Sequence, residues 1–542
     1  MSILKSVLHE KELKRFNDSF PKKEDLSYVQ QALRHFDVDI EVNTQHHIPK
    51  MGRIILIANH PIGALDTLAL LSVVTEIRSD IKIIDSPLLA TMPHLQPFTL
   101  PYDKSSSQAT EQFNMICQHL KDEGVLIVFP ASDVSSFNRL RIKDRHWQSD
   151  FLNIAEQTNS PILPALVSPK KTFLFYSLSI FSKPFSTLLL LCESLKQSNN
   201  TVSIQVGELI DPMAHEDLNL PFKTKVKLFQ KQVYRIGQNK PSLFRTLDPI
   251  APPEERQQLK KEVEACESLG ETRDNKKIFL YRSQTNSTLI REIGRLREEA
   301  FRLIGEGTGN ERDIDDYDKH YMHIVLWDED DLEVVGAYRL CATNNEPRLY
   351  TATLFEYTTD TEQIIQAGLE LGRSFIQPKY WGSRSLEYLW YGIAAFLRRN
   401  PQYRYLLGAV SISNTFSRPA KDLIVGYYQH YYADNEGLTL SSNRPYTIDD
   451  TARQRMSQLF QDKTAKEAFT ILKAQLRHLG YSAPALYKQY ADLTNPGGTR
   501  FLGFNIDPDF NDCVDGLVVV DINKMSAQKQ KRYGLMEHVP EN

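Results

Sequence analysis

The chain has 542 residues, a length that exceeds one ordinary hydrophobic core and suits two or three domains. Its 41% hydrophobic and 24% charged residues are normal for a folded soluble protein. The formal net charge of −4 gives no reason to expect nucleic acid as a partner, so any anionic partner requires a local basic patch.

The five cysteines are scattered along the chain, so no metal-binding or redox pair is expected. Such thiols are typical of a reducing compartment, and the opening MSILKSVLHEKELKRF carries charges too early for a signal peptide. We therefore expect a cytoplasmic protein without a resident metal or cofactor. Residues 172–191 are the most apolar stretch, but Lys183 and Pro184 interrupt it, which argues against a spanning helix. This stretch is either an interfacial helix or a buried strand and helix.

Strand-like and helix-like segments alternate through the first half, after a helical lead-in over residues 1–45. Short apolar runs predict buried strands, and periodic segments with helix-start signals predict helices. The predicted strands are 53–58, 81–84, 124–129 and 161–167, and the predicted helices are 61–78, 109–123 and 150–158. The alternation indicates an α/β domain with a largely parallel sheet.

Residues 241–276 are rich in charge and proline, which predicts an inter-domain linker that contains one polar helix. A second α/β pattern follows, beginning with an amphipathic helix and a hairpin whose two strands are joined by the acidic turn DEDD. Its predicted elements are the helix 288–305, the strands 321–327, 332–342, 369–376 and 403–413, the helix 386–399, further helices up to residue 492, and the strands 500–506 and 516–521. The predicted domains are 1–240 and 277–525, followed by a polar tail over 526–542.

The first candidate site lies in ANHPIGALD, residues 58–66, where a predicted strand passes into a helix. Ligands of open α/β sheets bind at such junctions. Asp66 can reach back to one imidazole nitrogen of His60, which leaves the other nitrogen free to take a proton from a hydroxyl group. An isolated pair of this kind is also compatible with a polar helix cap.

Three more segments follow in order: VFPASDVS at 128–135, a basic cluster at 139–145, and PILPALV at 161–167. Together with ANHPIGALD they resemble the lysophosphatidic acid and glycerolphosphate acyltransferase superfamily over residues 40–240, and most closely its branch that O-acylates amino-acid lipids. The resemblance implies that His60 is the general base and that Asp66 orients it. The substrate-binding candidates that accompany it are Asn59, Gly63, Phe129, Pro130, Ala131, Arg139 and Arg141.

Two departures from the superfamily pattern bear on the acceptor rather than on the chemistry. Five residues separate His60 from Asp66, whereas four is the commonest spacing, and Ser132 replaces the usual glycine. The basic cluster is either a binding surface for an anionic head group or acidic acyl carrier protein, or a solvated basic face.

The second candidate site combines DIDDYD at 313–318, VVGAYRL around Arg339, and LELGRSFI with Glu370 and Arg373. The succession resembles the acyl-homoserine lactone synthase-like branch of the GNAT superfamily, and more narrowly the N-acyltransferases that make lyso-ornithine lipid, over residues 277–525. Glu370 beside Arg373 can accept the proton of an ammonium group, and Asp315 with Asp318 can hold a cationic substrate. Alternatively, Arg339, Glu370 and Arg373 form a structural ion network.

The second half lacks the glycine-rich loop that holds the pyrophosphate of acetyl-CoA in many GNAT enzymes, because no such motif occurs between Phe375 and Phe396. This favours an acyl group carried by acyl carrier protein as the donor, with acyl-CoA as the other option.

Two acyltransferase-like halves resemble the bifunctional ornithine-lipid synthases. We therefore expect N-acylation of an amino acid with a 3-hydroxyacyl group, followed by O-acylation of that hydroxyl, at the inner face of the membrane. One alternative is a single-activity lysophospholipid O-acyltransferase whose second half only docks acyl carrier protein. Another is a non-catalytic, haemolysin-like membrane-binding protein.

Overall fold

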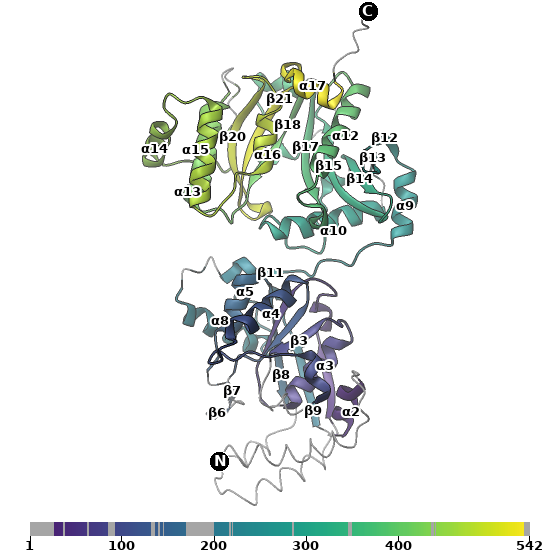
Figure 1. The fold of residues 1–542 in the computed structure, drawn as a ribbon, viewed down its shortest axis with the longest axis vertical. Helices are drawn as coiled ribbons and strands as arrows, with labels where there is room; N and C mark the ends of the chain where they lie inside the picture. Colours follow the sequence, from purple (N-terminus) through teal and green to yellow (C-terminus); the bar gives the residue numbers. More distant parts are fainter. Residues whose placement is uncertain are drawn as a thin grey trace, which may run out of the picture. The chain divides into compact units, whose positions relative to one another are not determined.

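The computed structural model describes residues 27–35, 38–61, 64–84, 93–131, 136–138, 141–144, 146–169, 200–215, 218, 220–283, 287–344, 349–434, 438 and 441–535. The chain forms two compact units, Met1–Pro249 and Ile250–Asn542, each with its own sheet (Figure 1). Among the residues described, no helix is both long enough and apolar enough to cross a membrane. The apolar stretch 172–191 lies outside the described residues.

The sheet of the N-terminal unit is mostly parallel and runs in the order β1-β9-β8-β2-β5-β3-β4, with β10 paired to β8 and β11 paired to β10. The only antiparallel contacts among its described strands involve β8 with β9 and β10, and β10 with β11. The strands are β1 (Val38–Asn43), β2 (Ile54–Ala58), β3 (Ile81–Ile84), β4 (Thr99–Leu100), β5 (Val125–Val128), β8 (Ile162–Pro169), β9 (Asn200–Val206), β10 (Leu209–Ile210) and β11 (Thr246–Leu247). A separate hairpin joins β6 (Ser136–Asn138) to β7 (Arg141–Lys143).

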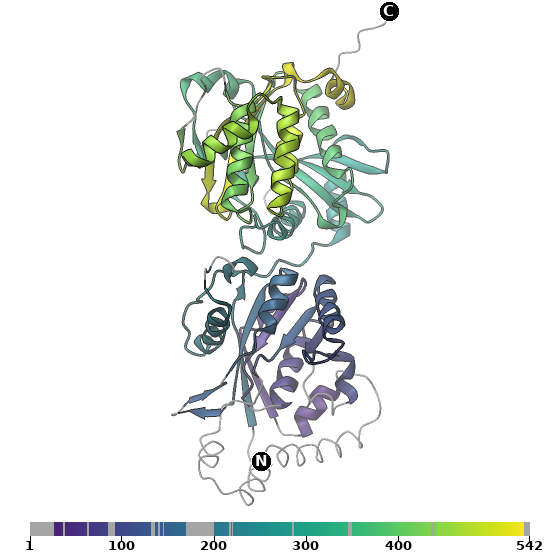
Figure 2. The same cartoon turned by 60° about the vertical axis from the view of Figure 1, so that its left-hand side comes forward.

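Helices cover both faces of this sheet (Figure 1, Figure 2). Alternate side chains of β2 enter two cores: Ile54 and Leu56 pack with α2 and α3, whereas Ile55 and Ile57 pack with α4, α5 and α8. A strand buried on both faces is expected to be apolar throughout, as IILIA is. The helices are α2 (Ser27–His35), α3 (Ala64–Thr75), α4 (Ala109–Lys121), α5 (Asp150–Thr158) and α8 (Phe222–Ile236).

The C-terminal unit has an eight-stranded mixed sheet in the order β12-β13-β14-β15-β17-β18-β21-β20. All neighbouring pairs are antiparallel except β17 and β18, which are parallel. The strands are β12 (Glu267–Glu271), β13 (Lys276–Arg282), β14 (Met322–Asp328), β15 (Glu333–Ala342), β17 (Gly368–Ile376), β18 (Tyr405–Ile412), β20 (Thr499–Asp507) and β21 (Cys513–Asp521), with β16 (Phe355–Glu356) paired to β19 (Ser441–Ser442) elsewhere. The α/β class, the parallel first sheet and the mixed second sheet are thus confirmed.

The parallel pair β17–β18 is short and then diverges. Its register covers only Gly368 to Glu370 against Tyr405 to Leu407. Gly408 follows, and a Cβ atom there would lie 2.1 Å from the carbonyl oxygen of Leu371, so only glycine fits this approach. Beyond this point the described residues of the two strands are not paired with one another.

Helices also lie on both faces of the second sheet. α9 (Arg256–Glu264) and α10 (Thr288–Leu303) share one core, and α12 (Ser385–Arg399), α13 (Arg418–Tyr431) and α15 (Ala465–His478) share the other. The remaining helices are α11 (Glu362–Gln366), α14 (Asp450–Phe460), α16 (Ala485–Ala491) and α17 (Ala527–Tyr533).

Two sequence-based expectations differ from this fold. Residues 38–43 form the strand β1 instead of continuing a helical lead-in, since VDIEVN alternates with period two and pairs with β9. The expected linker 241–276 contains elements of the second unit: α9 buries Leu259 and Val263, and β12 joins the sheet. Its high charge reflects exposed faces of packed elements, not free chain.

Candidate active sites

His60 and Asp66 meet at the carboxyl end of β2. His60 follows the strand, and Asp66 lies in the first turn of α3. His60 Nδ1 is 3.3 Å from Asp66 Oδ2, within ion-pair distance although not aligned as a hydrogen bond. The Asp66 side chain is fully buried, whereas that of His60 is 16% exposed. A buried carboxylate next to Nδ1 favours the tautomer whose Nε2 is free to accept a proton.

The surroundings of His60 combine an aromatic wall with a rigid backbone. The Phe129 ring lies 4.7 Å from the imidazole, centroid to centroid. Asn59 is buried, and its amide both donates to and accepts from the backbone of Val167 at 2.8 Å, so it ties β2 to β8 rather than facing a ligand. Pro130 accepts a backbone hydrogen bond from Gln148 at 2.7 Å. These contacts hold the end of the sheet at which a substrate would meet His60.

The structure does not describe all of the remaining substrate-binding candidates of the N-terminal unit. Gly63 and Arg139 lie outside the described residues, and of Arg141 only the backbone, in β7, is described. Ala131 is half-buried and forms a bridge with Trp147. The proposed substrate-binding role of these four residues stays a prediction.

Sequence analysis missed Asp144 and the basic face of α8. Asp144 is buried, its Oδ1 lies 3.4 Å from the His60 amide nitrogen, and its Oδ2 accepts from Trp147 Nε1 at 2.8 Å. It also lines a pocket of about 290 Å³ whose other walls come largely from α8 and the residues after it. The cationic residues of this pocket are Lys227, Lys231, Arg235 and Lys240. The repeated lysines of FKTKVKLFQKQVYRI were the available signal.

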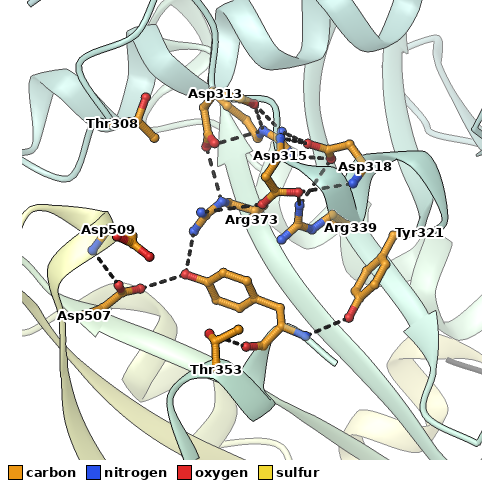
Figure 3. Close-up of polar contacts among 12 residues, drawn as sticks. Thr308, Asp313, Asp315, Asp318, Tyr321, Arg339, Thr353, Arg373, Asp507 and Asp509 are labelled. Carbon is orange, nitrogen blue, oxygen red and sulfur yellow. Dashed lines mark hydrogen bonds and ion pairs between the residues drawn. The ribbon is translucent and has the colours of Figure 1, made fainter. Parts of the chain in front are cut away.

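In the C-terminal unit, Asp318 is the centre of a buried ion network (Figure 3). Arg297 binds both of its carboxylate oxygens, at 3.0 and 2.7 Å. His323 Nε2 lies 3.0 Å from Oδ1, and Arg339 Nη1 lies 3.3 Å from the same oxygen and donates to Asp315 at 2.6 Å. Burial alone would raise the pKa of Asp318, but the charges of Arg297 and Arg339 and the His323 hydrogen bond hold it well below its usual value. Burial lowers the pKa of His323, so its ring is neutral.

Arg373 extends this network toward the diverging strands. Its Nε lies 3.4 Å from Asp313 Oδ2 and its Nη1 lies 3.4 Å from the Tyr350 hydroxyl, which donates to Asp507 at 2.7 Å (Figure 3). Arg373 has φ of 47°, in the left-handed region that side-chain-bearing residues rarely adopt. Strained residues of this kind cluster at functional sites, because the surrounding structure must hold them in place.

Glu370 is buried three residues before Arg373 on β17, and both of its carboxylate oxygens accept hydrogen bonds. Thr351 donates its amide to Oε1 at 2.8 Å, and the Tyr321 hydroxyl donates to Oε2. The same hydroxyl accepts the Tyr350 amide at 3.0 Å. Glu370 therefore fastens the segment around residue 350 to the sheet.

Three further buried carboxyl groups adjoin Arg373: Glu306 after α10, Asp507 at the end of β20 and Asp515 in β21. Burial, followed by the charge of Asp515, raises the pKa of Glu306 to about 8. Burial, followed by the charge of Asp507, raises the pKa of Asp515 to about 7. Within the described part of the chain, no three His, Cys, Asp or Glu residues are arranged to hold a metal ion.

The structure thus brings together Asp315, Asp318, Arg339 and Arg373 as predicted candidates, with Glu370 nearby. Arg297, Glu306 and Asp515 were not among the candidates from the sequence, and Asp313 was included there only as the first residue of DIDDYD. Arg297 had a signal, because it falls on the apolar face of an amphipathic helix, where a charge needs a partner.

Two family models match separate parts of the chain: an acyltransferase model over residues 1–239 and an acetyltransferase (GNAT) domain model over residues 296–391. A glycine N(alpha)-acyltransferase of Bacteroides thetaiotaomicron is 29% identical over 306 residues, which cover 53% of this chain and 90% of that protein. A lyso-glycine lipid O-acyltransferase of Phocaeicola vulgatus is 24% identical over 217 residues, which cover 39% of this chain and 78% of that protein.

An L-ornithine N(alpha)-acyltransferase of Rhodobacter capsulatus is 30% identical over 261 residues, which cover 45% of this chain and 90% of that protein. The two sites described above therefore belong to an acyltransferase domain and a GNAT domain joined in one chain. The protein is an acyltransferase and belongs to the same family as the Rhodobacter capsulatus L-ornithine N(alpha)-acyltransferase.

Proposed function

We propose that the chain makes an amino-acid lipid in two successive acyl transfers. The C-terminal unit attaches a 3-hydroxyacyl group to the nitrogen of an amino acid, and the N-terminal unit esterifies the new hydroxyl with a second acyl chain. The observation that carries this proposal is the match, in one chain, of a GNAT domain model to the second half and of an acyltransferase model to the first half. Their relatives are named for an N-acylation and for the O-acylation of a lyso-lipid, respectively.

In the O-acylation, His60 Nε2 takes the hydroxyl proton while the oxygen attacks the thioester carbonyl. Asp66, 3.3 Å from Nδ1, stabilises the imidazolium that forms. The proton then passes to the leaving thiolate. The apolar ring of Phe129 lies beside the imidazole, and less polar surroundings strengthen the attraction between His60 and Asp66.

In the N-acylation, Arg339 and Arg373 are candidates to bind the carboxylate of the amino acid. Each is buried and held by acidic partners, so their positions are fixed before the substrate arrives. Preorganised cations of this kind orient a substrate without further loss of side-chain freedom. Ornithine and glycine are the two acceptors to compare first.

Acyl carrier protein is the proposed donor, and the inner face of the membrane is the proposed site of action. Acidic carrier surfaces are attracted to basic ones, and the pocket on α8 presents Lys227, Lys231 and Lys240. The monoacylated product is amphiphilic, so retention at a membrane and fusion of the two activities would both limit its loss.

The test is lipid mass spectrometry of cells that express the chain, compared with variants of each site. We expect His60→Ala to accumulate the monoacylated lipid, because only the second transfer needs the imidazole. Arg339→Ala and Glu370→Ala should each abolish both lipids. The matched control is His46→Ala, an exposed histidine in the same unit as His60.

The proposal fails if wild-type lipid extracts contain neither product, or if His60→Ala, Arg339→Ala and Glu370→Ala all leave the two products unchanged. Acylation of lysophosphatidate by purified protein, without any amino acid, would instead indicate an enzyme with the O-acyltransferase activity alone.

A further inference from the structure

The buried charges around Arg373 do not balance. Three arginines, Arg297, Arg339 and Arg373, are matched by Asp313, Asp315 and Asp318. Glu306, Asp507 and Asp515 lie beyond these pairs and have no cation of their own among the described residues. Buried carboxylates are normally paired with a cation or bound to a metal.

Among the described residues, neither Glu306 nor Asp515 forms an ion pair with a cation. Glu306 is only 9% exposed, and no hydrogen bond or ion pair joins its carboxyl group to any described residue. Asp515 is 2% exposed, and its Oδ1 is buried without a hydrogen-bond partner, although its carboxyl group also forms side-chain hydrogen bonds with Ser411 and Asp507. Asp507, in contrast, accepts from the Tyr350 hydroxyl at 2.7 Å and from the Asp509 amide at 2.9 Å.

The cluster lies beside the point in the sheet where the pairing of β17 with β18 ends. Asp515 on β21 is paired in register with Ser411 on β18, four residues beyond the last pair of β17 with β18. Arg373 occupies the corresponding stretch of β17 in its strained conformation. The cluster thus borders the place where the pairing of β17 with β18 has ended.

We propose that Glu306 and Asp515 bind the α-ammonium group of the amino-acid substrate and that Glu306 accepts the proton it must lose before attacking the thioester. This inference rests on the proposed N-acylation and adds the identity of its base. A metal ion is disfavoured as the occupant, because the described residues offer no three-ligand arrangement. An ammonium group needs only hydrogen-bond acceptors and negative charge.

The chemistry is balanced as follows. The ammonium group enters, and the neutral carboxyl group of Glu306 loses its proton to solvent as it acquires a cationic partner. The ammonium then transfers one proton to the Glu306 carboxylate. The neutral amine forms the new C–N bond, the C–S bond breaks, and the second amine proton passes to the leaving thiolate.

The groups that face Glu306 and Asp515 favour this order of proton transfers. Asp507 adds negative charge from β20, and Arg373 on β17 is the only described cation that acts on both groups. Tyr487 on α16 and Cys513 on β21 also face them, and burial raises the pKa of each, so both are neutral. Glu370, in contrast, accepts hydrogen bonds on both of its oxygens from the Tyr321 hydroxyl and the Thr351 amide, and so holds the segment around residue 350.

Titration calorimetry in two buffers of different ionisation enthalpy measures the protons released on binding. Three probes distinguish the binding of an α-ammonium group from the binding of a terminal one. Glycine and norvaline carry only an α-ammonium group, and 5-aminovalerate carries only a terminal ammonium group. Near neutral pH we expect glycine and norvaline to release up to about one proton each from the full-length protein. Glu306→Gln should bind without this release, and the exposed-carboxylate control Glu311→Gln should behave as wild type.

Steady-state kinetics provide the second measurement. We expect Glu306→Gln to lower kcat for N-acylation by about 100-fold or more while KM for the acyl donor changes little. O-acylation of the lyso-lipid should be unaffected in the same variant. The inference is overturned if Glu306→Gln keeps wild-type kcat and proton release, or if only 5-aminovalerate binds. An inactive wild-type enzyme with intact ammonium binding would instead count against the proposed function.

Discussion

Replacing Glu306 with glutamine tests whether this carboxyl group is a buried charge that the fold tolerates at a cost. Its pKa rises from 4.5 to about 8 on folding, mainly through burial. Between these two values the folded protein binds more protons than the unfolded chain, so the free energy of unfolding falls as pH rises. A glutamine side chain stays neutral at every pH and removes this dependence.

The size of the effect follows from the pKa difference. A pKa of 4.5 in the unfolded chain and about 8 in the folded protein corresponds to about 5 kcal/mol once both states are ionised. The same relation leaves about 1 kcal/mol near pH 5.5. Relaxation and water entry reduce such penalties. We therefore expect the free energy of unfolding of the variant to exceed that of wild type by about 2–5 kcal/mol above pH 8 and by about 1 kcal/mol or less near pH 5.5.

Denaturant unfolding followed by tryptophan fluorescence suits this measurement, because three of the four tryptophans, Trp327, Trp381 and Trp390, lie in the C-terminal unit. The transition of that unit is fitted separately, since a two-unit chain need not unfold in one step. Glu311→Gln, whose carboxylate is 63% exposed, should track wild type at all pH values. The reasoning would be refuted if Glu306→Gln were less stable than wild type, or if the difference in their free energies of unfolding did not increase with pH.

Three other perturbations address the remaining sites. His60→Ala should reduce the rate of O-acylation by about 100- to 10,000-fold in assays with purified lyso-lipid, and leave N-acylation at the wild-type rate. Arg297→Ala should destabilise the C-terminal unit by about 3–5 kcal/mol in chemical denaturation, because Asp318 would remain buried without its bidentate partner. Lys227→Glu combined with Lys231→Glu should raise KM for acyl carrier protein at low ionic strength, and the difference should shrink as salt is added; an unchanged KM would place the donor elsewhere.

The fold of the N-terminal unit was largely predictable because its information is local. Each central strand is an unbroken apolar run that is buried on both faces, and a helix follows most of them. The edge strand β1 was missed because its alternating pattern carries little apolar weight, and it pairs with β9, more than 150 residues away. A short sequence window contains no information about a pairing partner that far away along the chain.

The two candidate sites also differ in how far apart their residues lie in the sequence. His60 and Asp66 are six residues apart on one strand–helix junction, so their spacing alone brings them together. Glu306 and Asp515 come from opposite ends of the C-terminal unit and meet only through the sheet. Nothing in the neighbourhood of Glu306, in LIGEGTGN, distinguishes it from a surface carboxylate, because its raised pKa arises from burial and from a charge distant in sequence.

The use of two kinds of base follows from the protons that the two reactions must remove. An alcohol holds its proton until the carbon–oxygen bond is forming, so its base must act during the attack and must carry the resulting positive charge; an imidazole next to a buried carboxylate does both. An ammonium group must lose a proton before it is a nucleophile, and it is far more acidic than an alcohol. A carboxyl group suffices there if its basicity is raised, and burial next to a second carboxylate raises it. On this argument, exchanging the two bases would disable both reactions, although each site would still contain a group able to accept a proton.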